Sequence, residues 1–422
     1  MTARRHLWAF VLLLSTWSGT SHAAALLIPA ALATDMAYDF RRGRIYIANG
    51  NEILRYSVAR QSFLSSIPMG DSAVLKGIDI SPDGTRLAVA DQNSSDTELW
   101  VHLLDLTTLV DSVRKVSKAE SESGMYSVAF AADRTLITTS SLVGSGWVPM
   151  RRLDLSTGAW AAVTDVRQDT MLSPSTDRQT IAFAEANISD GTWGVYDVPT
   201  KGLVRRQGYT DGTSNFNYEI TTDAMGGRFA IPTYHGLYLY DADFQLERIL
   251  GEYAGPRPLT AAYHPVENLL YCPWAETSTV RVFNARTRGW VSTIQIEDDL
   301  GFMGGAYTSG RIKLSADGSL VMVVVPGGVR YVRQYAPLAA AHVGTRATSG
   351  VSKDITLKGS VGNNGALTYS ILQRAQHGSV KVSGGKAIYR SVAGYHGSDS
   401  FKYRVRYGAA AVADATVNVT VP

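Results

Sequence analysis

Ser81-Pro-Asp-Gly-Thr-Arg-Leu-Ala-Val-Ala90 is the segment that decides the fold of this 422-residue chain. Its Asp and Gly favour a tight turn, because hairpin turns need positive φ or a side chain that bonds its own backbone. The run that follows the turn has strand character. Ser315-Ala-Asp-Gly318 precedes Leu320-Val-Met-Val-Val-Val325 in the same way. The sequence therefore predicts a hairpin unit that occurs more than once.

Related turns recur at regular intervals between residues 35 and 341. Their acidic residues lie 44, 50, 44, 46, 44 and 50 positions apart, at Asp39, Asp83, Asp133, Asp177, Asp223, Glu267 and Asp317. A second turn, after β-rich triplets such as Leu104-Asp-Leu106, alternates with the first. A period of about 45 residues with four strands per unit is typical of propeller blades. We predict seven blades over residues 26–341, with small residues such as Ala88, Ala90, Ala182 and Ala184 on inner strands near the axis.

The seventh unit is one strand short. It supplies strands near 310–314, 320–325 and 329–335 and then ends. We expect Leu26-Leu-Ile-Pro-Ala30 to provide the missing outer strand, which would close the ring and remove an exposed sheet edge. The alternative is that residues 26–32 are only a linker.

Residues 343–422 differ in composition and contain short strands about ten residues apart, which indicates a β-sandwich of immunoglobulin size. In Phe401-Lys-Tyr-Arg-Val-Arg-Tyr407 the apolar and basic residues alternate. Because strand side chains alternate between faces, Lys402, Arg404 and Arg406 should lie on one outer face. This stripe is a candidate contact for acidic polysaccharide, teichoic acid or lipid head groups. The alternative is a solvated sheet face that keeps the domain monomeric.

Both regions resemble known families. The segments at 81–90 and 315–325 resemble the YVTN-type, WD40-like repeats of surface-layer proteins and lactonase-like propellers. That resemblance implies blade geometry and assigns no catalytic residue. Leu367-Thr-Tyr-Ser-Ile371 and Ala393-Gly-Tyr-His-Gly-Ser-Asp-Ser-Phe401 resemble the Ig-like or cadherin-like repeats of bacterial adhesins and secreted enzymes. The resemblance implies an all-β chain, with a seven-bladed β-propeller followed by an Ig-like β-sandwich. Such repeats often begin with acidic segments that can bind calcium, but residues 344–350 of this chain contain no carboxylate. The resemblance therefore does not imply a calcium site here.

The first 25 residues read as a signal peptide. Arg4 and Arg5 precede the apolar run Leu7–Leu14, and small residues follow at 23–25. The run is too short to span a bilayer, and no later stretch approaches about 18 apolar residues. We therefore expect an exported protein, periplasmic, at the cell surface or extracellular, with no transmembrane segment. Its predicted domains are residues 1–25, 26–341 and 343–422.

Charge is shared unevenly along the exported part. Residues 343–422 carry ten Lys and Arg against three Asp, or +7, whereas residues 26–342 carry −6. A basic tail beside a slightly acidic main domain suggests an anionic partner for the tail and does not favour nucleic-acid binding. The lone Cys272 excludes an internal disulfide and a cluster of cysteine metal ligands.

Candidate binding residues come from the loops predicted to gather at one end of the ring. Aromatic faces stack on sugars, and carboxylates and amides bind hydroxyls. The proposed set is Asp91, Asn93, Trp147, Glu185, Asn215, Asn217, Tyr234 and Trp274. For an enzyme, Tyr234 or His235 with Arg257 fits a polysaccharide lyase in kind, and Glu276 is one of several carboxylates open to a glycoside hydrolase.

The sequence contains no motif that selects a reaction. We expect a non-catalytic, monomeric recognition protein that binds a polysaccharide or a surface protein on the loop face, with the basic C-terminal domain as spacer or anchor. The alternative is a secreted polysaccharide lyase or glycoside hydrolase using the same face. No cofactor and no metal are implied.

Overall fold

A computed structural model describes residues 24–186, 191–207, 217–251, 255–301 and 306–422. Most of the predicted signal peptide lies outside these residues. All the extended regular structure of the described chain is β-strand, and it contains no helix with the length and apolar character needed to cross a membrane.

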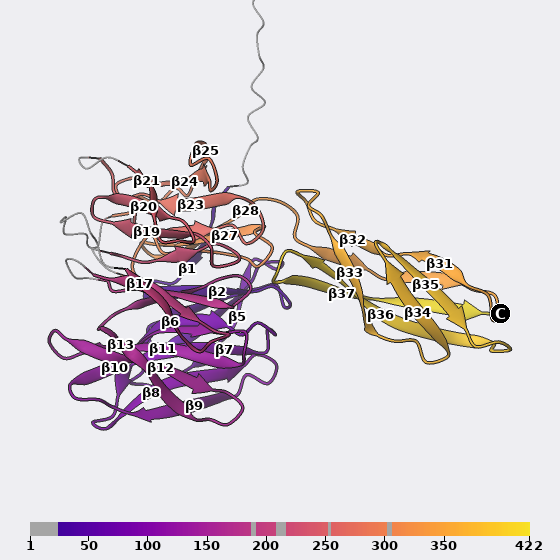
Figure 1. Ribbon diagram of the computed structural model, residues 1–422, viewed down its shortest axis with the longest axis horizontal. Coiled ribbons are helices and arrows are strands. Elements are labelled where there is room, and N and C mark those ends of the chain that lie inside the picture. Colours follow the sequence, from indigo (N-terminus) through magenta and orange to yellow (C-terminus); the bar gives the residue numbers. More distant parts are fainter. Residues whose placement is uncertain (1–23, 187–190, 208–216, 252–254, 302–305) are drawn as a thin grey trace, which may run out of the picture.

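Seven four-stranded antiparallel sheets form the larger part of the molecule. The first strand of each sheet contacts the first strands of the two neighbouring sheets, and the first strand of the first sheet contacts that of the last, so the sheets close a ring around an axis. Figure 1 shows these sheets on one side and a smaller strand-rich domain projecting from them. The molecule is all-β, as predicted, with a seven-bladed propeller.

The strands of the blades follow one another from the axis outward. The first blade contains β2 (Ala33–Asp39), β3 (Arg44–Asn49), β4 (Glu52–Ser57) and β5 (Ser62–Pro68). The second contains β6 (Leu75–Ile80), β7 (Arg86–Ser94), β8 (Glu98–Asp105) and β9 (Asp111–Ser117). The third contains β10 (Glu122–Phe130), β11 (Thr135–Leu142), β12 (Trp147–Asp154) and β13 (Trp160–Arg167). The fourth blade contains β14 (Met171–Pro174), β15 (Thr180–Ala184), β16 (Trp193–Asp197) and β17 (Gly202–Gln207). The fifth contains β18 (Thr221–Thr222), β19 (Phe229–Thr233), β20 (Gly236–Tyr240) and β21 (Leu246–Leu250). The sixth contains β22 (Ala262–Tyr263), β23 (Leu269–Pro273), β24 (Thr279–Asn284) and β25 (Trp290–Gln295).

The seventh blade joins the two ends of the ring. It consists of β26 (Ile312–Leu314), β27 (Leu320–Val325), β28 (Gly328–Arg333) and, outermost, β1 (Leu26–Pro29). β1 runs antiparallel to β28, with Leu26 opposite Tyr331 and Ile28 opposite Val329. The predicted closure by residues 26–30 is confirmed.

One detail of the blade prediction is wrong. Ala88, Ala90, Ala182 and Ala184 are fully buried, but they lie on β7 and β15, the second strands of their blades. Second strands are covered on both faces by the neighbouring blades, which is why small side chains suit them. The strands next to the axis are those that precede the Asp-Gly turns, and they carry the charged side chains described below.

The C-terminal domain packs two main sheets around one core. One sheet holds β30 (Val343–Arg346), β37 (Ala411–Val421), β36 (Gly397–Tyr407) and β33 (Thr368–Gln373), and the other holds β31 (Lys353–Thr356), β35 (Lys386–Ser391) and β34 (Gly378–Ser383). β29 (Ala339–Ala341) pairs with β32 (Lys358–Ser360), so these three residues join the C-terminal strands rather than a blade. The predicted domain limits otherwise stay a prediction.

The hairpin between β36 and β37 reaches the propeller. Gly408 at its tip has a φ of 63°, and a Cβ there would lie 2.5 Å from Cγ2 of Val266 in the propeller. Only glycine fits such a conformation and approach without strain. Nearby, Nδ2 of Asn363 donates to Oε1 of Glu267 across the same junction at 2.6 Å. The two domains are therefore in specific contact.

Candidate functional site

Four of the predicted binding residues are buried and used inside the chain. Asp91, Glu185, Asn217 and Trp274 are each at most 5% exposed. Glu185 accepts from the backbone of Arg167 and Thr192, both at 3.2 Å, and Nδ2 of Asn217 donates to carbonyl oxygens of Glu185 and Gly191. The guanidinium of Arg281 lies over the Trp274 ring at 4.4 Å. The structure places these side chains beneath the loop face, where they hold the loops.

Asp91 belongs to a buried charge cluster in the second blade. Its Oδ1 accepts from the backbone of Val74 at 2.8 Å and of Asn93 at 2.9 Å. Its Oδ2 faces Nε2 of His102 at 3.5 Å, and Nδ1 of His102 lies 2.6 Å from Oδ2 of Asp111. Burial alone would lower the pKa of His102, but hydrogen bonds with Asp111 and Asp91 outweigh it and raise the pKa to about 9.

This cluster predicts a pH-dependent stability. The pKa of His102 is raised above its ordinary value of 6.5. The pairing of His102 therefore contributes its full stabilisation below pH 6.5, and this contribution is lost as pH rises through about 9. Relative to His102→Gln, the parent should lose on the order of 3 kcal/mol of unfolding free energy between pH 6 and pH 10. Urea unfolding of both proteins across this range measures the difference. Parallel pH profiles of parent and variant would contradict the assignment.

The other predicted loop residues are more accessible. Trp147 is 62% exposed, with the guanidinium of Arg167 over its ring at 4.9 Å. Tyr234 is half-buried, and the guanidinium of Arg257 lies 3.4 Å from its ring centroid. Asn93 and His235 are half-buried and Glu276 is exposed. Asn215 lies outside the described residues. The structure therefore pairs Tyr234 with Arg257, and His235 lies edge-on beside the Tyr234 ring.

The predicted cationic stripe is divided. Phe401, Tyr403, Val405 and Tyr407 point into the core, as the alternation predicts, and Lys402 and Arg406 are exposed. Arg404 is half-buried and donates from Nε to Asp414 at 2.7 Å and from Nη2 at 2.8 Å. Arg404 and Arg406 also line a cavity, whereas Lys402 does not. Two of the three cations thus face the propeller junction.

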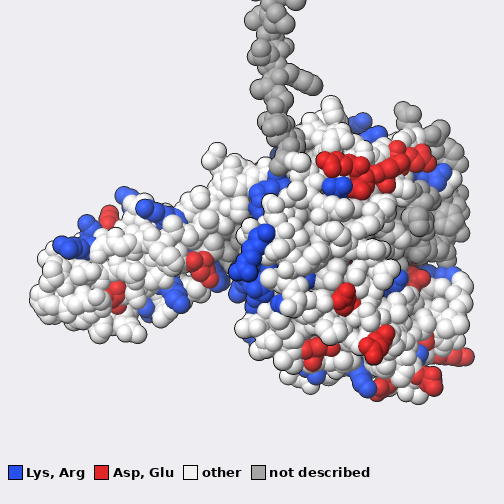
Figure 2. Space-filling model, turned by 180° about the vertical axis from the view of Figure 1, so that it is seen from behind, with Lys and Arg blue, Asp and Glu red and all other residues white. Residues whose placement is uncertain are grey.

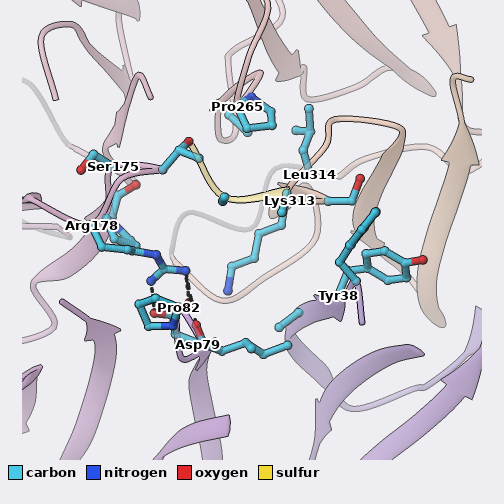
Figure 3. A pocket seen from close by; sticks show the side chains of 18 of the residues that line it. Tyr38, Asp79, Pro82, Ser175, Arg178, Pro265, Lys313 and Leu314 are labelled. Carbon is cyan, nitrogen blue, oxygen red and sulfur yellow. Dashed lines mark hydrogen bonds and ion pairs between the residues drawn. The ribbon is translucent and has the colours of Figure 1, made fainter. Parts of the chain in front are cut away.

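That cavity has a volume of about 620 Å³ and lies between the propeller axis and the C-terminal domain. Its walls come from the inner strands β2, β6, β10, β14, β18, β22 and β26 and from the turns that follow several of them. The β36–β37 hairpin lines it from the other side with Arg404, Arg406 and residues 409, 410 and 412. In Figure 3, Asp79, Arg178 and Lys313 converge among the rings of Pro82 and Pro265. The cavity is on the face opposite the predicted binding loops.

A buried ion network lies at the base of the cavity. Nε of Arg311 donates to Oδ1 of Asp35 at 2.6 Å, and Nη1 of Arg311 pairs with Glu219. Nζ of Lys313 donates to Oδ2 of Asp35 at 2.8 Å and to the carbonyl oxygen of Ile78 at 2.8 Å. Four charged side chains therefore form one unit: Asp35 on β2, Arg311 directly before β26, Lys313 on β26 and Glu219 before β18.

Burial and the neighbouring charges together shift the pKa of each member of the network. Burial alone would raise the pKa of Asp35, but the charges of Arg311 and Lys313 outweigh it and lower the pKa below its ordinary value. Burial raises the pKa of Glu219 despite the nearby Arg311. Burial lowers the pKa of Lys313, and Asp35 only partly offsets this effect. Glu219 is therefore the member that is most easily protonated on acidification.

A second pair lies nearer the mouth. Asp79 on β6 accepts from both Nη atoms of Arg178, which follows β14, and from the backbone nitrogen of Phe130 at 2.8 Å. Nη1 of Arg178 also donates to the carbonyl oxygen of Phe130 at 3.2 Å. These bonds link three blades, and the pair forms a fixed wall of the cavity in Figure 3.

Apolar side chains separate the cavity from the loop face. The guanidinium of Arg311 lies over the ring of Tyr307 at 4.6 Å, and this ring packs edge-on against Tyr126 with centroids 5.0 Å apart. Met171, Ala186 and Ala306 complete the cluster. Within the described residues, no group of three or more His, Cys, Asp or Glu side chains is placed to hold a metal ion.

Comparison with known proteins identifies the smaller domain. Residues 334–420 match the family model for the bacterial Ig domain. The C-terminal domain is a bacterial Ig domain. It includes β29, in agreement with the pairing of that strand. The β36–β37 hairpin that lines the cavity thus belongs to the bacterial Ig domain, and the inner strands belong to the propeller. No curated protein matches the sequence.

Solved structures match the propeller. Hydrazine synthase of Kuenenia stuttgartiensis is 12% identical, with a TM-score of 0.57, over 75% of this chain and 98% of that one. A chain of the mitotic checkpoint complex is 10% identical, with a TM-score of 0.57, over 79% and 98%. The β-propeller domain of Myceliophteria thermophila Cps50 (Swd1) is 10% identical, with a TM-score of 0.54, over 73% and 98%. At these identities the similarity shows the fold alone.

Proposed function

We propose that this chain is an exported, non-catalytic recognition protein that binds a small polar ligand in the cavity between the propeller and the bacterial Ig domain. The observation that carries the proposal is the cavity itself. About 620 Å³ is within the usual range of small-molecule sites, and the lining combines apolar rings with a few placed charges. Bacterial Ig domains are common in surface and exported proteins, which supports export.

The state of the carboxylates favours binding over hydrolysis. Glycoside hydrolases need one carboxyl group as acid and another as base or nucleophile on either side of the scissile bond. In this lining, Asp79 is held by Arg178, and Glu219 is held by Arg311. Asp83 and Asp177 accept from the hydroxyls of Ser81 and Ser175, each at 2.6 Å. These groups shape the walls and turns.

The loop face remains the second candidate for a polysaccharide or a surface protein. Trp147 carries this alternative, because a ring that is 62% exposed can stack on a sugar or on a partner side chain. Tyr234 and Arg257 lie on the same face and would serve a lyase there. The bacterial Ig domain would then act as a spacer or anchor.

A ligand screen with a blocking variant tests the proposal. The chain from residue 24 is screened by thermal unfolding against neutral and acidic mono- to trisaccharides and polysaccharides. We expect at least one small ligand to raise the unfolding temperature of the parent. Ala410→Trp should abolish the shift because residue 410 lines the cavity. Ala161→Trp, at an exposed position on β13, should leave it unchanged.

Three outcomes contradict the proposal. They are no shift with any small ligand, a shift that persists in Ala410→Trp, and release of new reducing or unsaturated ends from a polysaccharide. The last result would assign the protein to the lyases or hydrolases. A companion Trp147→Ala variant shows whether polymer retention depends on the loop face.

A further inference from the structure

Basic side chains outnumber acidic ones in the cavity between the propeller and the bacterial Ig domain. Six basic and five acidic side chains line it. The acidic ones are engaged: Asp39 with Arg42 and its own turn, Asp79 with Arg178, Glu219 with Arg311, and Asp83 and Asp177 with neighbouring hydroxyls. Figure 2 shows Lys and Arg gathered where the two domains meet. The remaining binding capacity of the lining is therefore cationic.

Lys313 supplies a donor from the propeller. An ammonium group has three N–H bonds. Two of them point to Asp35 and to the carbonyl oxygen of Ile78, both at 2.8 Å, and no described residue accepts the third. The side chain is 27% exposed, and Figure 3 shows it extending into the open centre of the cavity.

Arg404 and Arg406 supply donors from the bacterial Ig domain. Arg404 uses Nε and Nη2 on Asp414, so its Nη1 has no acceptor among the described residues. Arg406 uses Nη1 on the carbonyl oxygen of Ala409 at 2.6 Å and is otherwise exposed. Asp414 has a lowered pKa because of its hydrogen bond with Arg404 and the charges of Arg404, Arg41 and Lys402. One carboxylate therefore faces three cations.

Neutral residues also line the cavity. They include Pro82, Pro174 and Pro265, whose rings are apolar, and the hydroxyl-bearing residues Ser173 and Thr221. A sugar ring offers both C–H faces and hydroxyls, and a uronate adds one carboxylate. Cations bind a carboxylate by charge-assisted hydrogen bonds, which are roughly twice as strong as neutral ones.

We infer that the ligand of this cavity is a small acidic sugar of the uronate class, which lies between Lys313 of the propeller and Arg404 and Arg406 of the bacterial Ig domain and whose carboxylate is bound by cations of this lining. This inference rests on the proposed function and deepens it. It makes the site composite, because neither domain alone supplies both sets of donors. The Ig domain is then part of the recognition site.

Isothermal titration calorimetry with defined probes tests the inference. The probes are mono-, di- and trigalacturonate, the corresponding neutral galactose oligomers, inorganic phosphate and sulfate. We expect one of the uronates to bind and its neutral counterpart to bind at least about tenfold more weakly. Added sodium chloride should weaken the binding of the uronate. Arg406→Gln and Arg404→Gln should each weaken uronate binding by about ten- to a hundredfold.

Lys402→Gln is the matched control. Lys402 is an exposed cation on the same strand that does not line the cavity, so its removal should change affinity less than about twofold. Lys313→Met tests the donor that the propeller contributes. Because Lys313 also pairs with buried Asp35, its folding is checked first by circular dichroism, and the two arginine variants carry the test if it unfolds.

The outcomes separate the inference from the function on which it rests. Equal binding of neutral and acidic sugars, binding of phosphate or sulfate alone, or equal effects of Lys402→Gln and Arg406→Gln would overturn the uronate assignment while leaving a ligand in the cavity. Failure of these probes together with every small ligand of the wider screen would overturn both.

Discussion

Arg311→Met is expected to lower the free energy of unfolding at pH 7 by about 3–5 kcal/mol, the cost typical of removing one partner from a buried ion network. Arg311 is 6% exposed and is the partner of both Asp35 and Glu219. In the variant, Lys313 still pairs with Asp35, but Glu219 is left as a buried carboxylate without a counter-charge. Urea unfolding of parent and variant measures the loss.

The pH dependence distinguishes this cause from a simple packing defect. In the parent, Asp35 has a lowered pKa, so its pairing stabilises the fold above its ordinary value of 3.8 and is lost as pH falls through the folded value. In the variant, buried Glu219 can bind a proton and become neutral, so acidification from pH 7 to pH 5 should recover stability. The difference in free energy of unfolding between parent and variant should therefore be smaller at pH 5 than at pH 7.

Removing the orphaned charge is the control. Arg311→Met combined with Glu219→Gln should recover at least about half of the loss at pH 7, because no buried charge then lacks a partner. A single variant as stable as the parent at pH 7, or a loss that does not change with pH and is not relieved by Glu219→Gln, would refute the electrostatic account.

The repeat period predicted the fold because it reports on local chemistry. Turns such as Ser81–Gly84 and Ser315–Gly318 need particular residues wherever they occur, so their spacing counts the blades. The closing strand was also predictable, since a three-stranded seventh unit leaves one edge unpaired. The bacterial Ig domain was predictable from its strand spacing and from the alternation of apolar and basic residues at 401–407.

The candidate site was not predictable in the same way. The small residues of the strands that follow the turns suggest that these strands lie next to the axis, whereas the strands that precede the turns line it. Arg311-Ile-Lys-Leu314 alternates charged and apolar residues, and Asp35, Asp79 and Glu219 stand in or beside the corresponding strand of other blades. A charge beside the first strand of a unit was the available signal. Each such charge looks isolated in sequence, because its partner comes from another blade.

The loop-face prediction failed to distinguish accessible residues from buried ones for a related reason. Asp91 lies in the last part of β7 and Glu185 directly follows β15, but backbone N–H groups of neighbouring segments donate to both carboxylates. Sequence position gives the end of the ring on which a residue lies. It does not give the direction of the side chain, which depends on contacts between blades and, for Arg404 and Arg406, between domains.

Ring closure gives the other large effect. A chain that begins at Ala31 lacks β1, and we expect it to lose at least about 4 kcal/mol of unfolding free energy and to aggregate. Ile28 on β1 is fully buried, and Arg330 donates to the carbonyl oxygen of Ala25 at 2.9 Å. Deleting the strand removes this packing and exposes the edge of β28, which becomes free to pair with other chains.

Point variants on the same strand make this prediction specific. Ile28→Ala should cost about 2–4 kcal/mol, because it leaves a cavity between the first and last blades, whereas Leu27→Ala, at a position 38% exposed, should cost less than about 1 kcal/mol. Urea unfolding gives both values, and light scattering of the shortened chain, against a chain from Ala24, reports the exposed edge. Equal costs at the two positions, or a soluble shortened chain with parental stability, would mean that β1 does not hold the ring closed. The alternation of these costs follows directly from the strand geometry, since neighbouring side chains of β1 point to opposite faces of the seventh blade.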